Sequence, residues 1–359
     1  MKNPIKSNWF SFKLGILSFV LVLILSGISE GATFSIGYSQ EKLKSNSSRD
    51  LDIRIWYPVE AGGEKVLVGE NIVFYGFEAT LEGTLASGTF PLVILSHGLN
   101  GNNLNQAWLA VALAKQGVIV VAPNHPGTTS LDSNSAETAK LWERPHDISR
   151  VVDHMLSDSK WGKAVDEREI AVIGHSLGGA TALFVAGGRF SPDRFEEFCK
   201  LKPDQVGNIW YQKYQIGKKA EDKGLVSQNW QDERVSKVIL LDPGLSQGFD
   251  PASLAGIDVP VLVFGAGAES KNEMPLDDES RYLAKVLPKE QTIYIEVEDA
   301  SHFSFFPLMK PSAAEFLKEA SRGDEIIAFD GRGRSREELH KKFIDLTILF
   351  LAQGNLEIQ

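Results

Sequence analysis

Hydrophobic and polar positions follow two different patterns along the chain. Residues 34–38 and 51–57 alternate apolar with polar side chains, which is typical of half-buried antiparallel strands. From Phe90 onward the pattern changes to short, continuous apolar runs rich in Val and Ile. Such runs are expected of strands in a parallel sheet covered on both faces. They span residues 91–96, 118–122, 170–173, 238–241, 259–264 and 292–297.

Helix-length segments separate these apolar runs, and they span residues 104–115, 147–156, 177–186 and 279–286. Alternating strands and helices imply right-handed crossovers and a mostly parallel, doubly wound α/β sheet. The stretch 188–237 breaks the alternation, because it carries aromatic residues among many charges and is too long for a simple connection. We predict a helical insertion there. Two compatible interpretations are an excursion packed on the surface and a cap whose aromatic side chains line a substrate pocket.

The N-terminus has the composition of an export signal. Three lysines at positions 2, 6 and 13 precede the apolar run 14–28, and Gly31 and Ala32 follow. The run is shorter than the roughly 20 residues of a membrane-spanning helix, which favours a secretory signal peptide over residues 1–32. Because residues 29–32 match a cleavage site poorly, an uncleaved anchor is the alternative. The sequence predicts export, to the periplasm or the medium, of one domain spanning residues 33–359.

Composition and charge narrow the class of partner. The chain has 359 residues, of which 43% are hydrophobic and 23% charged, as expected of a globular protein. Its formal net charge of -10 argues against a nucleic-acid partner, and any membrane contact would come from an uncleaved N-terminal segment. Cys199 is the one cysteine, so no intramolecular disulfide can form. No metal or organic cofactor is implied, and a small-molecule substrate is expected.

A Gly-x-Ser-x-Gly segment lies between a predicted strand and a predicted helix. The apolar run 170–173 leads directly into Gly174-His175-Ser176-Leu177-Gly178-Gly179. In this order, strand, motif and helix form the nucleophile elbow of α/β hydrolases, in which a strained turn exposes the serine. Ser176 is therefore the candidate nucleophile.

A nucleophilic serine needs a base and an orienting acid, which follow it in the order acid, then histidine, in this fold. His302 follows the last apolar run and is the candidate base. Two carboxylates are candidates for the acid. Asp242 directly follows the run 238–241, and Glu269 lies in the loop after 259–264. We favour Asp242 because it lies at the end of its strand.

An oxyanion formed during ester hydrolysis needs backbone N–H donors. In this fold one comes from the residue after the nucleophile and one from the loop after an early core strand. These positions are Leu177 and Leu99. The second lies in the glycine-containing segment His97-Gly98-Leu99-Asn100-Gly101, which can fold close to a developing negative charge.

Several motifs resemble the bacterial hydrolases called predicted dienelactone hydrolases, which are related to plasma-type platelet-activating factor acetylhydrolases. The resemblance runs from about residue 34 to the end and implies Asp242 as the acid and short acyl or phospholipid-like esters as substrates. True dienelactone hydrolases use a cysteine where this chain has Ser176. Cutinase-like polyester hydrolases resemble the chain locally, at 265–269 and 300–303, and imply Glu269 instead. The wider motifs are Ser-His-Gly-Leu at 96–99, Asn-His-Pro-Gly at 124–127, Trp-x-Arg-Pro-x-Asp at 142–147, Gly-His-Ser-Leu-Gly-Gly at 174–179, Leu-Asp-Pro at 241–243 and Ala-Ser-His-Phe-Ser-Phe at 300–305.

Together these features predict an α/β-hydrolase fold and a serine carboxylic ester hydrolase that acts through an acyl-enzyme. Two alternatives use the same scaffold. The first is an amide or lactone hydrolase with the same triad, and the second is a non-catalytic binding protein.

Overall fold

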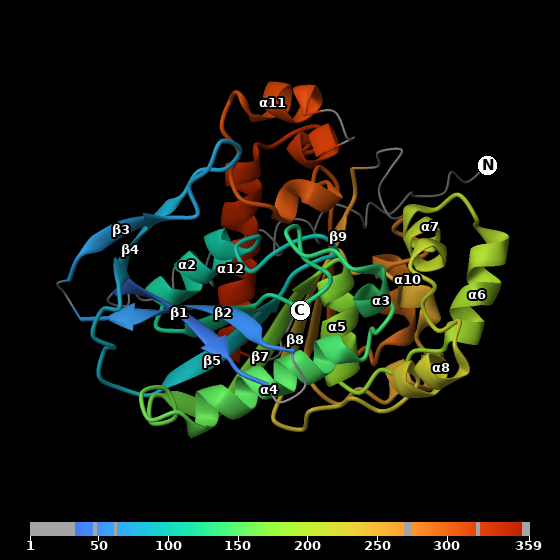
Figure 1. The fold of residues 1–359 in the computed structure, drawn as a ribbon, viewed down its shortest axis with the longest axis horizontal. Helices are drawn as coiled ribbons and strands as arrows, with labels where there is room; N and C mark the ends of the chain where they lie inside the picture. The colour runs from blue at the N-terminus through green and yellow to red at the C-terminus, as the bar shows by residue number, and fades with distance from the viewer. Residues whose placement is uncertain (1–32, 46–48, 61–62, 269–274, 321–323, 354–359) are drawn as a thin grey trace, which may run out of the picture. The chain divides into compact units, whose positions relative to one another are not determined.

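The computed structural model describes residues 33–45, 49–60, 63–268, 275–320 and 324–353 (Figure 1). The predicted signal segment 1–32 and the candidate acid Glu269 lie outside these ranges. Within the ranges, no helix combines the length and the hydropathy needed to cross a membrane.

A ten-stranded sheet forms the centre of the fold, in the order β10-β9-β8-β7-β5-β6-β2-β1-β4-β3. The six strands from β10 to β6 are parallel, and β2 and β1 continue the sheet in antiparallel fashion. The mostly parallel α/β sheet is therefore confirmed, as are the antiparallel opening strands. The strands are β1 (Ser35–Leu43), β2 (Leu51–Val59), β3 (Lys65–Val68), β4 (Phe77–Leu81), β5 (Phe90–Ser96), β6 (Ile119–Pro123), β7 (Val165–His175), β8 (Lys237–Leu241), β9 (Val261–Ala266) and β10 (Thr292–Val297).

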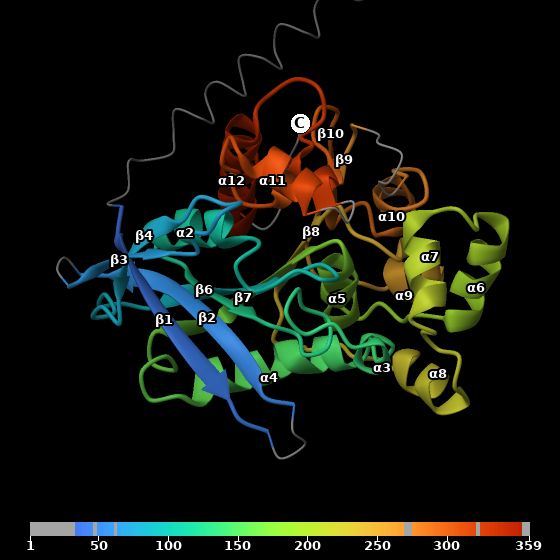
Figure 2. The same ribbon diagram turned by 45° about the horizontal axis from the view of Figure 1, so that its top comes forward.

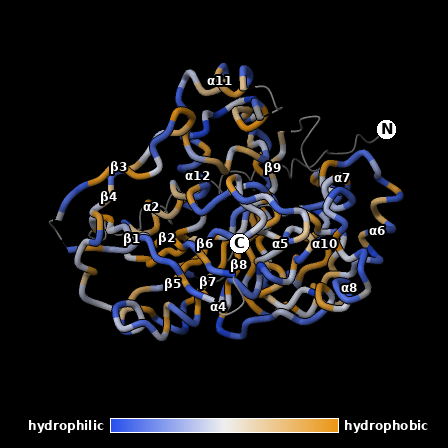
Figure 3. Tube along the Cα trace, viewed as in Figure 1, coloured by the Kyte–Doolittle hydropathy of each residue, from blue (hydrophilic) through white to orange (hydrophobic). Residues whose placement is uncertain are grey.

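Helices cover both faces of the sheet (Figure 2). α2 (Ala107–Lys115) and α12 (Arg336–Gln353) pack together on one face, whereas α4 (Glu143–Ser157), α5 (Leu177–Val185) and α10 (Ser280–Val286) share the core of the other. Figure 3 shows hydrophobic positions concentrated along the central strands between these layers. The short elements are α3 (Ser135–Thr138), η1 (Ser246–Gly248), α9 (Pro251–Ala255), η2 (His302–Phe305), α11 (Ala313–Glu319) and η3 (Asp324–Ala328).

The stretch 188–237 contains three helices, α6 (Pro192–Leu201), α7 (Val206–Lys213) and α8 (Ala220–Val226). Its aromatic residues Phe190, Phe195 and Tyr211 are almost completely buried. The Phe190 ring packs against Phe249, 5.4 Å between centroids, and Phe195 against Tyr211, 4.7 Å. These three side chains belong to the core and are therefore not free to line a pocket.

Two helices begin three or more residues away from their predicted starts. α2 begins at Ala107 and not at 104, because the preceding residues form a polar turn in which the Asn105 side chain accepts from the Asn102 amide at 2.8 Å. α4 begins at Glu143, four residues before the predicted start. The strands β3 and β4, which complete the sheet beyond β1, were not predicted because they are only four and five residues long.

Candidate active site

Ser176 occupies a strained turn between β7 and α5. Its backbone has φ 55° and ψ -119°, a conformation that residues other than glycine rarely adopt. The neighbouring glycines are required sterically. A Cβ on Gly174 would lie 1.9 Å from the Gly178 carbonyl oxygen, and one on Gly178 would lie 1.9 Å from the carbonyl oxygen of Ser96. The structure thus places Ser176, partly exposed, at the sharp turn that the motif predicts.

Asp242 and His302 meet although they lie 60 positions apart in sequence. The Nδ1 atom of His302 is 2.6 Å from Oδ2 of Asp242, and both side chains are buried. The other carboxylate oxygen accepts from the Ala266 amide at 3.0 Å, which fixes the orientation of Asp242. Because an ionised carboxylate only accepts, Nδ1 of His302 carries the proton and Nε2 is left as an acceptor.

His302 also lies against the elbow. Its ring centroid is 4.6 Å from that of His175, the residue before Ser176. Nε2 of His175 is 2.9 Å from the His302 carbonyl oxygen. Burial lowers the pKa of His175 well below its usual range, so the ring is neutral at pH 7 and donates this bond from Nε2. The turn that carries Ser176 and the loop that carries His302 are therefore joined directly.

The loop after β5 lies beside Ser176. A Cβ placed on Gly98 would be only 3.1 Å from the Cβ of Ser176, so the backbone approaches the serine as closely as a glycine permits. Among the described residues, neither the Leu99 amide nor the Leu177 amide donates a hydrogen bond to another protein group. Both amides therefore lack a protein acceptor within the described chain, as the backbone donors of an oxyanion hole must.

His97 fixes the direction of the Leu99 amide. Its Nε2 accepts from the His125 amide at 3.1 Å, so Nδ1 carries the proton and donates to the Gly98 carbonyl at 2.7 Å. The Gly98 carbonyl and the Leu99 N–H belong to one planar trans peptide and point in opposite directions. Anchoring the carbonyl therefore aims the amide to the other side. Burial lowers the pKa of His97, which keeps this neutral tautomer at pH 7.

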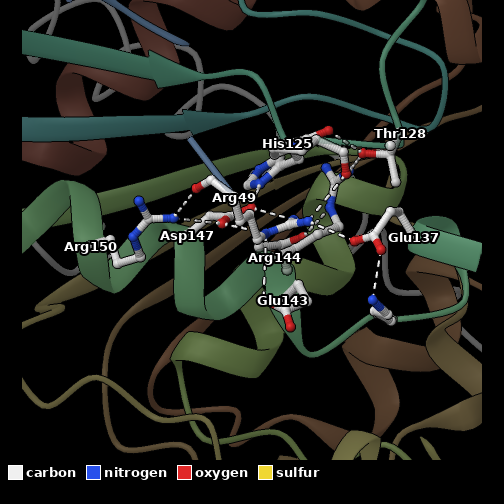
Figure 4. A network of polar contacts seen from close by, with 12 residues as sticks. Arg49, His125, Thr128, Glu137, Glu143, Arg144, Asp147 and Arg150 are labelled. Atoms are coloured by element: carbon white, nitrogen blue, oxygen red, sulfur yellow. Dashed lines mark hydrogen bonds and ion pairs between the residues drawn. The ribbon is translucent and has the colours of Figure 1, made fainter. Parts of the chain in front are cut away.

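Behind this loop lies a buried polar network that sequence reasoning did not assign to the site (Figure 4). Arg49 binds both carboxylate oxygens of Asp147, at 2.9 and 2.7 Å, and His125 contacts the same carboxylate at 2.9 Å. A signal was present in the sequence. Arg144 lies four positions before the buried Ile148, and Asp147 lies four positions before the buried Val151. Both charged residues therefore fall on the apolar face of α4, where charged side chains are rarely buried unless they are paired.

The chain belongs to the alpha/beta hydrolase family, whose family model matches residues 93–319. Among curated proteins, it is similar to cutinase est2 of Thermobifida alba, with 24% identity over 220 residues that cover 61% of this chain and 54% of the relative. Cutinase est1 of the same organism is 29% identical over 126 residues, which cover 34% and 38% of the two chains. The chain thus spans about half or less of the length of these relatives.

Among solved structures, the ferulic acid esterase from Streptomyces cinnamoneus has a similar fold, with a TM-score of 0.61. It is 18% identical, and the superposition covers 91% of this chain and 92% of that one. The likeness confirms the predicted α/β-hydrolase fold. The narrower resemblance to dienelactone hydrolases and acetylhydrolases stays a prediction.

Proposed function

We propose that the protein is a serine carboxylic ester hydrolase that acts through an acyl-enzyme. The observation that carries the proposal is the 2.6 Å contact between His302 and Asp242, packed against the turn that bears Ser176. Ser176 Oγ attacks the ester carbonyl carbon while its proton passes to Nε2 of His302. The Leu99 and Leu177 amides bind the oxyanion. The alcohol leaves with the proton, and water then hydrolyses the acyl-serine by the same route.

Small-molecule esters with short acyl groups, including phospholipid-like esters, are the proposed substrates. The cutinase and ferulic acid esterase names of the similar proteins support ester hydrolysis. We further propose that the predicted signal segment directs the enzyme out of the cytoplasm and that no nucleic acid takes part. A panel of nitrophenyl esters of increasing acyl length, with a lactone and an anilide added, tests this choice. The proposal expects acetyl and butanoyl esters to give the highest kcat/KM.

Replacing the nucleophile tests the mechanism. Ser176→Ala should reduce kcat on nitrophenyl acetate by roughly 10⁴-fold or more, because catalysis without the nucleophile rests on binding and the oxyanion donors. Ser87→Ala, at an exposed serine between β4 and β5, is the matched control and should keep wild-type activity. Full activity of Ser176→Ala would exclude the mechanism.

The two candidate acids can be separated in the same assay. Asp242→Asn should reduce kcat by roughly 10³- to 10⁴-fold, because the amide favours the wrong tautomer of His302. Glu269→Gln should stay within a few-fold of wild type. The reverse result would assign the acid to Glu269.

A further inference from the structure

Arg144 is a buried cation beside the candidate oxyanion loop. It lies in the first turn of α4, and only 2% of the residue is exposed. Its guanidinium donates to the Thr128 hydroxyl at 2.7 Å and to the Thr181 hydroxyl at 3.0 Å. It also donates to the His97 carbonyl and lies 3.4 Å from the Ser96 hydroxyl. All four acceptors are neutral. Within the described chain no carboxylate pairs directly with Arg144, so the free-energy cost of removing its charge from water is not compensated by an ion pair.

Two of these contacts lead to the two candidate oxyanion donors. The His97 carbonyl lies two residues before Leu99, in the loop that follows β5. Thr181 lies in α5, and its hydroxyl donates in turn to the carbonyl of Leu177 at 3.1 Å. One planar guanidinium therefore connects the loop that carries the first donor with the helix that carries the second.

The surrounding network holds Arg144 and the loop in place. Asp147, one turn further along α4, is paired with Arg49, as Figure 4 shows, and its negative charge favours the protonated guanidinium. His125 bridges Asp147 and the Ser96 hydroxyl, at 2.9 and 3.0 Å. Burial lowers the pKa of Arg144 to about 9, so the side chain stays charged at neutral pH.

We propose that Arg144 is a positioning residue for the oxyanion hole, because it fixes the loop 96–99 against α5 so that the Leu99 and Leu177 amides converge on one oxygen. The inference rests on the proposed ester hydrolysis. Oxyanion donors act only when they are about 3 Å from the developing charge, and these two lie on separate elements. A planar fork can hold two acceptors at a fixed spacing, which a flexible ammonium group cannot do.

Variants at Arg144 test the inference on nitrophenyl acetate. Arg144→Lys and Arg144→Met should lower kcat by roughly 10- to 100-fold while KM stays within about twofold, because the donors act on the transition state. Affinity for a trifluoromethyl ketone, which forms an oxyanion on Ser176, should fall by the same factor as kcat/KM. Arg168→Met is the matched control. Arg168 lies on β7, where its exposed side chain pairs with Asp166 outside this network, and its replacement should leave both quantities unchanged.

A second variant tests the same role in case the Arg144 variants do not fold. Thr181→Val has nearly the same shape and removes only the hydroxyl between Arg144 and Leu177, so it should lower kcat about 3- to 10-fold. Because the buried Nε of Arg144 loses its acceptor, the urea midpoint should fall, but unfolding should remain one cooperative transition. Folded Arg144 and Thr181 variants with wild-type kcat and ketone affinity would overturn the positioning role. If Ser176→Ala were fully active, the proposed function itself would fail. The two failures are therefore distinguishable.

Discussion

Two of the six non-glycine residues with positive φ in the described chain directly follow the central strands β7 and β8. Ser176 has φ 55° and Asp242 has φ 44°, and residues in this region cost about 1 to 3 kcal/mol each. Hydrogen bonds between the two turns offset the cost. The Ser176 amide donates to the Leu241 carbonyl at 3.1 Å, and the Gly244 amide donates to the Ser176 carbonyl at 3.1 Å. The candidate nucleophile and the candidate acid are thus held by each other's backbone.

The buried carboxyl group of Glu279 gives a prediction at the residue scale. Glu279 accepts from the Ser246 amide at 2.7 Å, and burial raises its pKa to about 8. The unfolded chain releases this proton near the ordinary pKa of glutamate, about 4.3, so the wild-type free energy of unfolding falls as pH rises from there to about 8. Glu279→Gln removes the effect. Its stability relative to wild type should therefore rise by roughly 1 kcal/mol per pH unit between about pH 6 and 8, then level off.

Urea unfolding of both proteins at several pH values measures this difference. A difference that does not change with pH would mean that Glu279 is ionised in the folded protein at neutral pH.

At the scale of elements, the sequence predicted those features whose residues lie close together along the chain. The parallel strands and the elbow were predictable because apolar runs, glycines and Ser176 act within a few residues of each other. The contact between Asp242 and His302 could be predicted only from the order in which this fold places its motifs. Taken alone, the carboxylates of Asp242 and Glu269 are equally typical of residues that cap a helix or a turn. The cluster around Arg144 was not predicted, because Arg49, the partner of Asp147, is 98 positions away from that residue and resembles a surface arginine until the fold brings the two segments together.

The close contact of the elbow with the loop after β5 can be tested with a pair of glycine variants. Gly178→Ala places a Cβ 1.9 Å from the Ser96 carbonyl oxygen and should cost roughly 3 kcal/mol or more, with loss of activity. Gly224→Ala, inside α8, meets nothing within 4 Å and should stabilise the protein by about 0.5 to 1 kcal/mol. Chemical unfolding of both variants gives the comparison. Equal effects would show that the elbow is not closely packed against the loop.

Across the whole molecule, stability depends on histidines that are buried in the neutral form. Burial lowers the pKa of His97, His125 and His175 well below the usual range and that of His340 to about 3. These side chains join separate elements, as when His340 of α12 stacks on Trp108 of α2 with 3.8 Å between centroids. Neutral histidine is thus part of how α12 is joined to α2 and to the loop after His302, and of how the loops of the site are joined to one another.

As pH decreases, the free energy of unfolding should therefore begin to fall at a higher pH than the titration of carboxylates alone would give. Below the unfolded pKa of about 6.5 the unfolded chain takes up protons that the folded protein refuses, so stability is full above that pH and falls as pH decreases. Each such histidine contributes roughly 1 kcal/mol per pH unit. His340→Gln should make the slope between about pH 6 and 5 shallower by that amount, measured by urea unfolding. The exposed His146→Gln controls for loss of a histidine. An unchanged slope in His340→Gln would contradict the account.

Covalent labelling of the folded protein with a fluorophosphonate tests the central claim most directly. If Ser176 is the nucleophile activated by His302, intact-mass analysis shows one phosphonyl group per chain, and peptide mapping places it on Ser176. Labelling should disappear in Ser176→Ala and slow strongly in His302→Ala. A folded protein that is not labelled, or is labelled at another serine, would contradict the assignment.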